Sequence, residues 1–218
     1  VNALVERGYR VAVADQYEPD AGDHARERVR VVTPGTGLEP SDDDARYLAA
    51  VVSEGSAGDA AGGARTADSD GPYGVAFADV TTGRFLATTV DDGGDLRAEL
   101  YRFDPAEVLP GPHVRNDDGL LGAVREDLSG RVTAFDAEAF AAGRAEHAVR
   151  EQFGRETTDS VGLDSTLAVR AAGAVLSYVE EAGAGGLASM TRLTADGADG
   201  RGGVGPTTQR NTEVTETR

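Results

Sequence analysis

The sequence predicts an α/β fold with a mixed sheet, and three patterns lead to this prediction. Residues 73–90 alternate like two strands around a turn at residues 81–83, which predicts a β-hairpin. Helical and strand patterns then follow one another along residues 96–153. Near the amino end, a helix that Gly8 closes runs directly into a strand at residues 9–14. Elements that alternate in this way build a sheet covered by helices.

Residues 1–40 are predicted to be part of an α/β domain. Their second strand, at residues 26–33, alternates valines on one side with Arg26, Arg28 and Arg30 on the other. A proline and a glycine then end this strand.

Residues 41–72 are predicted to be a linker that begins with a helix. Ser41 and the three aspartates after it supply the capping hydroxyl and the negative charge that are typical of a helix start. The apolar stripe of this helix would consist of Ala45, Leu48, Ala49 and Val52. Residues 53–71 are mainly glycine, alanine, serine, aspartate and threonine without an apolar period, which is the composition of a flexible linker.

Residues 73–163 are predicted to form one compact α/β domain. After the hairpin, the apolar pattern predicts helices and strands in alternation, at residues 96–103, 107–109, 120–128, 131–135 and 140–153. A hairpin followed by alternating helices and strands indicates a mixed sheet.

Beyond Gly162 the pattern predicts helix alone. Asp164 and Ser165 offer a cap for a long helix whose apolar stripe ends near Gly183. Residues 164–218 are therefore expected to begin an all-α domain, with a glycine-rich, acidic loop at residues 195–206.

The net charge of the chain is strongly negative. It contains 38 acidic and 21 basic residues, the latter all arginine, for a formal charge of -17. Phosphates repel such a chain, so composition alone argues against binding to nucleic acid. At about 1 M salt, however, the Debye length is only ~3 Å, and dense surface carboxylates repel each other little. We interpret the negative charge as adaptation to a salt-rich cytoplasm. Under this interpretation the net charge does not indicate which partner the protein binds.

Several classes of site and location are excluded or disfavoured by composition. The chain has no cysteine, so disulfides and thiolate metal sites are excluded. No run approaches about 18 consecutive apolar residues, and no basic segment followed by an apolar run opens the chain, so we expect a cytoplasmic protein without a membrane span. Because the chain opens with Val1 and its single methionine is Met190, we expect it to be cut from a longer protein.

Six segments, in this order, resemble the MutS family of DNA mismatch-repair proteins. They are YRVAVADQ at 9–16, RVRVVTPGTG at 28–37, YGVAFADVTTGRF at 73–85, AELYRFDPAEVL at 98–109, AAGAVLSYVEEA at 171–182 and TTQRNTEVTET at 207–217. The resemblance implies the end of a mismatch-binding domain at 1–40, a ribonuclease H-like connector domain at 73–163 and the start of an all-α core domain from residue 164. For the full-length family it implies a homodimeric ATPase that uses ATP and Mg²⁺, binds mismatched double-stranded DNA and acts with a MutL-type partner.

The chain also departs from the family pattern. The phenylalanine-any-glutamate wedge motif of the family would lie upstream of Val1, and no phosphate-binding loop G-x-x-x-x-G-K-[ST] is present. Thr212 stands where the family usually has a leucine after its arginine-asparagine pair. We therefore assign no catalytic residue, cofactor or metal ligand to this chain, and expect it to be a nonenzymatic fragment.

Arg26 and Arg30 are the candidate DNA-binding residues. In an extended strand, arginines at every second position lie about 7 Å apart on one face, a spacing comparable with that of successive phosphates. These two positions also fall where the resembling family tends to carry basic residues. The alternative interpretation is a solvated strand face beside Glu27.

Asp79 supports an alternative function, a metal-dependent nuclease. It lies near the end of a strand, where ribonuclease H-like nucleases hold a catalytic carboxylate, and other acids such as Glu99 and Asp136 would have to converge on it. The simpler interpretation is that its carboxylate caps the turn at residues 81–83. The resemblance favours the cap, because the connector uses this fold without cutting. A stand-alone protein-interaction module is the other alternative.

Glycines and histidines give no further site. The TPGTG segment at residues 33–37 and the glycines of residues 200–205 are interpreted as turns rather than phosphate cradles. His24, His113 and His147 are too scattered for a zinc site.

Overall fold

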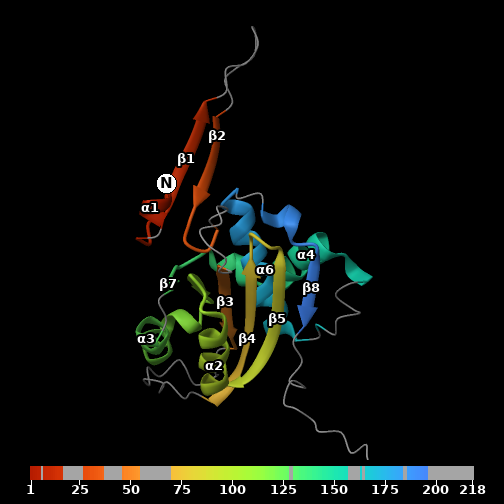
Figure 1. Cartoon of the computed structure of the whole chain (residues 1–218). Coiled ribbons are helices and arrows are strands. Elements are labelled where there is room, and N and C mark those ends of the chain that lie inside the picture. The colour runs from red at the N-terminus through yellow and green to blue at the C-terminus, as the bar shows by residue number, and fades with distance from the viewer. Residues whose placement is uncertain are drawn as a thin grey trace, which may run out of the picture.

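A computed structural model describes residues 1–5, 7–16, 27–36, 46–54, 70–127, 130–156, 163, 165–183 and 186–195. These residues form a mixed α/β body and a separate strand pair, which projects from one end of the body in Figure 1. None of the described helices is long and apolar enough to cross a membrane.

The strand pair comes from the amino-terminal part of the chain. A short helix, α1 (Asn2–Val5), leads through Gly8, which has a positive φ of 82°, into β1 (Val11–Gln16). β2 (Glu27–Val32) runs antiparallel to β1, with Val11 opposite Val32. Both predicted strands are thus confirmed. A two-stranded sheet is marginally stable by itself, so its attachment to the body is important.

The body contains a six-stranded mixed sheet in the order β7-β6-β3-β4-β5-β8. Its strands are β3 (Tyr47–Ser53), β4 (Asp70–Asp79), β5 (Arg84–Asp92), β6 (Glu107–Pro110), β7 (Arg131–Val132) and β8 (Arg192–Ala195). β4 is antiparallel to both of its neighbours, and the other neighbouring strands are parallel. The predicted mixed α/β class and the predicted hairpin are confirmed, whereas the ribonuclease H-like classification stays a prediction.

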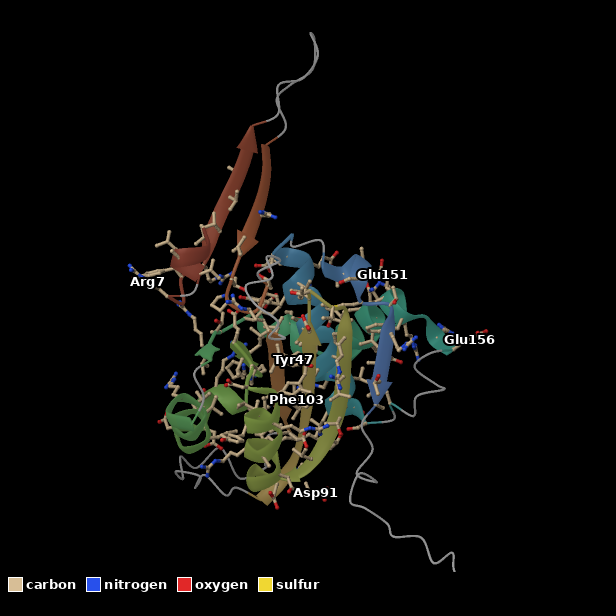
Figure 2. The ribbon with its side chains drawn as sticks, viewed as in Figure 1. Arg7, Tyr47, Asp91, Phe103, Glu151 and Glu156 are labelled. Atoms are coloured by element: carbon tan, nitrogen blue, oxygen red, sulfur yellow. The ribbon has the colours of Figure 1, made fainter. Side chains whose placement is uncertain are left out.

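Helices cover both faces of the sheet (Figure 1). The helices of the body are α2 (Gly93–Phe103), α3 (Asp118–Asp127), α4 (Ala142–Phe153) and α6 (Thr166–Glu181), with short 3₁₀ helices η2 (Val114–Asn116), η3 (Ala137–Phe140) and η4 (Gly186–Ser189). One apolar cluster lies between the sheet and α4 and α6, and a second lies between the sheet and α2 and α3. In the second cluster, the Phe103 ring meets the Tyr47 ring edge to face, with 5.1 Å between the ring centres, and stacks on the Phe77 ring, with 4.1 Å between the centres. Figure 2 labels Phe103 and Tyr47.

Strand β3 replaces the helix that the sequence indicated. All seven residues of β3 are buried, with Leu48, Ala50 and Val52 in one cluster and the residues between them in the other. The predicted stripe of Leu48, Ala49 and Val52 is therefore wrong, and the helix start predicted at residues 41–45 lies outside the described residues. A short run that is apolar on both sides fits a buried strand as well as a helix, and pairing with β4 and β6 decides between them. The sheet thus begins within the stretch expected to be a linker.

The long helix predicted after Gly162 is present as α6. Its N-cap Ser165 accepts a hydrogen bond from the Ala168 amide at 3.5 Å. The expectation of helix alone in this region is wrong, because β8 adds a parallel strand beside β5 and buries Leu193 in the sheet body. The loop expected at residues 195–206 lies outside the described residues from 196 onward, as does the segment 207–217.

Helices α4 and α6 touch at backbone distance through Gly173. A Cβ atom placed on Gly173 would lie 2.3 Å from the Cα atom and 2.4 Å from the Cβ atom of Ala145. Real Cβ atoms do not approach so closely, so the two helices would have to separate. Gly122 in α3 is a contrasting case, since a Cβ atom there would meet nothing within 4 Å.

We expect Gly173→Ala to lower the free energy of unfolding by about 1–3 kcal/mol, because overpacking forces backbone shifts. Gly122→Ala is the matched control, and it should raise stability by about 0.5–1 kcal/mol through helix propensity alone. Urea unfolding followed by circular dichroism measures both changes. A Gly173→Ala protein as stable as the wild type would contradict the close packing of α4 on α6.

Candidate functional site

The Asp79 carboxylate caps the turn that joins β4 and β5. Its Oδ1 atom accepts hydrogen bonds from the backbone amides of Thr81 at 2.9 Å and Thr82 at 3.3 Å. The Thr82 hydroxyl donates to Oδ2 at 2.7 Å. The interpretation of Asp79 as a turn cap is therefore confirmed, and both of its oxygens have donors within the turn.

The other two acids of the nuclease alternative act elsewhere. Glu99 on α2 forms an ion pair at 3.3 Å with Arg102, one turn further along the same helix. Asp136 is the N-cap of η3, where its Oδ1 atom accepts from the Glu138 amide at 3.1 Å. Among the described residues, no group of three or more histidine, aspartate or glutamate side chains could hold a metal ion. The nuclease alternative is not favoured.

The strand pair contains one of the two candidate DNA-binding arginines. Arg30 lies on β2 opposite Val13, and its side chain is exposed. Arg26 lies outside the described residues. An exposed guanidinium on a projecting strand suits a phosphate contact, but DNA binding by either arginine stays a prediction.

A buried turn connects the strand pair to the body. Residues 33–36 directly follow β2, and all four are buried. The Thr36 amide donates to the Thr33 carbonyl at 3.1 Å, and the Thr33 amide donates to the Thr36 hydroxyl at 3.0 Å. Residues 33–36 of the TPGTG segment thus form a turn, as predicted, and they are buried, whereas Gly37 lies outside the described residues.

The Glu107 carboxylate binds this turn to the sheet. Glu107 begins β6 and is 0% exposed. Its Oε2 atom accepts from the Gly35 amide at 3.1 Å, and its Oε1 atom accepts from the hydroxyls of Thr133 at 2.6 Å and Tyr178 at 2.8 Å. One carboxylate therefore joins the turn after β2, the segment after β7 and helix α6. We call Glu107, Thr133, Tyr178 and residues 33–36 the joint.

Tyr178 is kept protonated at the joint. Burial raises the pKa of its hydroxyl well above the usual range, and the negative charge of Glu107 beside it raises the pKa further. The hydroxyl consequently remains a donor toward the carboxylate. The Arg10 guanidinium, which lies 5.8 Å from the centre of the Tyr178 ring, acts on this pKa in the opposite direction. A further bond from the strand pair runs from the Val31 amide to the carbonyl of Ala182, at the end of α6, at 2.9 Å.

Comparison with known proteins decides the family. The model of the family described as MutS domain II matches residues 46–189, which span the strands and helices of the body from β3 to η4. The chain belongs to the MutS family. It is 56% identical over 220 residues to "DNA mismatch repair protein MutS 1" of Haloarcula marismortui, covering 100% of this chain and 23% of that protein.

Two further MutS relatives show the same partial coverage. "DNA mismatch repair protein MutS 1" of Halobacterium salinarum is 52% identical over 99% of this chain and 23% of its own length. "DNA mismatch repair protein MutS" of Ruminiclostridium cellulolyticum is 29% identical over 98% of this chain and 24% of its own length. The chain thus spans about a quarter of the length of the curated relatives it matches. The two haloarchaeal relatives agree with the salt-rich origin inferred from the acidic composition.

The joint was not identified from the MutS sequence pattern, although one signal was available. Glu107 lies within the segment AEVLP, where a charged residue is the first residue of an otherwise apolar short strand. A carboxylate in such a place needs several donors, because an unpaired buried charge is strongly unfavourable. Its donors come from residues 35, 133 and 178, however, and no local pattern connects those positions.

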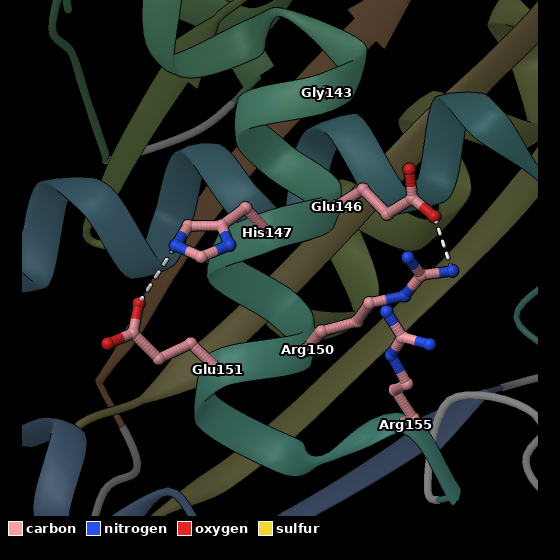
Figure 3. A pocket seen from close by; sticks show the side chains of 6 residues that line it. All are labelled: Gly143, Glu146, His147, Arg150, Glu151 and Arg155. Atoms are coloured by element: carbon pink, nitrogen blue, oxygen red, sulfur yellow. Dashed lines mark ion pairs between the residues drawn. The ribbon is translucent and has the colours of Figure 1, made fainter.

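A shallow hollow on α4 offers no comparable chemistry (Figure 3). It has a volume of about 460 Å³ and is lined by Gly143, Glu146, His147, Arg150, Glu151 and Arg155. His147 and Glu151 are 80% and 76% exposed and pair at 3.5 Å, and Arg150 pairs with Glu146 one turn away on the same helix. Exposed ion pairs of this kind contribute little to folding stability. The hollow is a solvated helix face of mixed charge.

We expect Asp79→Ala to lower the free energy of unfolding by about 1–3 kcal/mol, because the turn amides lose their acceptor. Asp79→Asn should lower the free energy of unfolding by less than half of this amount. The amide oxygen of the asparagine can still accept from the Thr81 amide, while its amino group donates to the Thr82 hydroxyl. Urea unfolding checks both variants. Magnesium-dependent DNA cleavage by the wild type that disappears in Asp79→Asn would instead support the nuclease alternative.

Proposed function

We propose that this chain is part of a MutS-type mismatch-repair protein, in which it acts as a nonenzymatic connector. The observation that carries the proposal is the joint, where a projecting strand pair is fastened to a compact sheet body by buried hydrogen bonds. Membership of the MutS family and the names of the relatives support the assignment to mismatch repair. The connector transmits the position of the mismatch-binding domain to the core and the distant ATPase.

Helix α6 is suited to this transmission. Its carboxyl end receives the Val31 amide from the strand pair, and Tyr178 in its last turns contributes to the joint. The rest of α6 packs across the sheet, where Gly74 allows the β4 backbone to approach the backbone of Leu167. A helix packed so tightly moves as a rigid unit, so a displacement at the strand pair is carried along the whole face of the sheet.

For the complete protein we propose the remaining properties of the family. These are binding to mismatched double-stranded DNA, use of ATP and Mg²⁺, homodimer formation, action with a MutL-type partner and a cytoplasmic location. The chain has no phosphate-binding loop, so nucleotide hydrolysis belongs to other parts of that protein. The alternative of a stand-alone interaction module would require the 218-residue chain to function without those parts.

We expect the purified 218-residue chain to show no ATP hydrolysis above a mock purification and no preference for mismatched over matched DNA. Deletion of the complete gene should raise the spontaneous mutation rate of its host, and the intact gene should restore it. A host with an unchanged mutation rate would contradict the mismatch-repair assignment. Hydrolysis by the chain alone would contradict its role as a nonenzymatic connector.

Arg26→Gln and Arg30→Gln in the complete protein should weaken binding to matched and mismatched DNA to a similar extent. Each lost phosphate contact should reduce the slope of log affinity against log salt by about 1. Salt titrations with a fluorescent duplex measure this slope. Arg144→Gln is the matched control, because Arg144 is an exposed arginine on α4 in the body. An unchanged slope in both Arg26→Gln and Arg30→Gln would contradict the assignment of these arginines to DNA binding.

A further inference from the structure

The Gly35–Glu107 contact joins two segments that are 72 positions apart in sequence, one beside the strand pair and the other in the six-stranded sheet. Glu107 is fixed in the sheet, because β6 pairs with β3 on one side and with β7 on the other. Gly35 lies in the turn that follows β2, at the base of the strand pair β1–β2, which we call the arm. The hydrogen bond between them is therefore formed between the body and the arm, and it is buried.

The shape of the turn is adapted to this contact. A Cβ atom on Gly35 would lie 3.0 Å from the Glu107 Cβ atom, 3.0 Å from the Leu48 Cδ1 atom and 3.1 Å from the Glu107 Oε2 atom. Glycine thus lets the backbone of the turn lie directly on the carboxylate and on the central strand. A larger residue would require the turn, or the side chains of Glu107 and Leu48, to shift by a few tenths of an ångström.

The carboxylate also makes the contact directional. Apolar surfaces can slide over one another at little cost, whereas a hydrogen bond weakens steeply when its angle or distance changes. Thr133 and Tyr178 both donate to Oε1, which holds the carboxyl group so that Oε2 faces Gly35. The buried Oε2 atom either accepts the hydrogen bond from the turn or has no donor from it, and a buried charged oxygen without a donor is unfavourable. The arm therefore has one preferred orientation.

We propose that Glu107 is a positioning residue that fixes the orientation of the strand pair on the connector, and that Thr133 and Tyr178 orient its carboxylate for this purpose. The proposal rests on the connector function proposed above and assigns that function to one contact. Movement of the arm must break the Gly35 hydrogen bond or carry β6 and α6 with it. Glu107 thereby couples the arm to strand β6 within the sheet and to helix α6, which packs across it.

Hydrogen exchange of the 218-residue chain tests the contact itself. We expect Gly35→Ala and Glu107→Met to accelerate exchange in residues 27–36 by about tenfold or more, the factor that corresponds to loss of one hydrogen bond to a charged group. Glu107→Gln should restore much of the protection, because its amide oxygen can face Gly35 while its amino group donates to the two hydroxyls. Gly122→Ala, which meets open space, is the matched control.

The exchange of β4 and α2 separates a local effect from general unfolding. These elements should remain protected in Gly35→Ala, which leaves the carboxylate in place. If Glu107→Met exposes the whole chain, Gly35→Ala alone decides the result. Unchanged exchange in residues 27–36 of Gly35→Ala would overturn the proposal.

The same variants in the complete gene test the coupling. We expect Gly35→Ala and Glu107→Met to raise the mutation rate and Glu107→Gln to bring it back toward that of the wild type. If deletion of the gene leaves the mutation rate unchanged, the mismatch-repair assignment is wrong, while the exchange data still report on the contact. If deletion raises the rate but Gly35→Ala loosens the arm without affecting repair, the positioning role is wrong.

Discussion

Strand β3 is the constraint on which the rest of the structure depends. It is buried on both faces and pairs with β4 over its full length and with β6 on its other side. Both apolar clusters include its side chains, so both helical layers pack against it. A strand in this position has to be apolar on both sides, which explains the uninterrupted run YLAAVV.

The central position of β3 also determines where the buried carboxylate lies. Leu48 of β3 is the register partner of Glu107, and the Leu48 side chain reaches the place where Gly35 packs. The contact with the arm is thus made beside a strand that is buried along its whole length. A buried charge is tolerated there because three donors from three segments satisfy it. The stability of the sheet and the attachment of the arm are consequently linked.

The charges of this MutS chain serve two distinct purposes. Most of its 38 acidic side chains contribute to a net charge of -17, which suits a salt-rich solution and indicates nothing about partners. Asp79 and Glu107 are different, because each is buried and each accepts from several donors. Asp79 stabilises a turn within one hairpin, whereas Glu107 connects distant parts of the chain. The latter kind of contact is the one that can transmit a movement.

The sequence by itself determined the elements whose signals are local. The hairpin around residues 81–83, the Asp79 cap, the turn at residues 33–36 and the long helix α6 depend on neighbours a few positions away, and all were predicted. Only the tertiary structure decided the remainder. β3 and β8 are strands because of the partners beside them, and the donors of Glu107 lie 26, 71 and 72 positions away. The periodicity of apolar residues in the sequence cannot predict these contacts, because they form only when the sheet brings distant segments together.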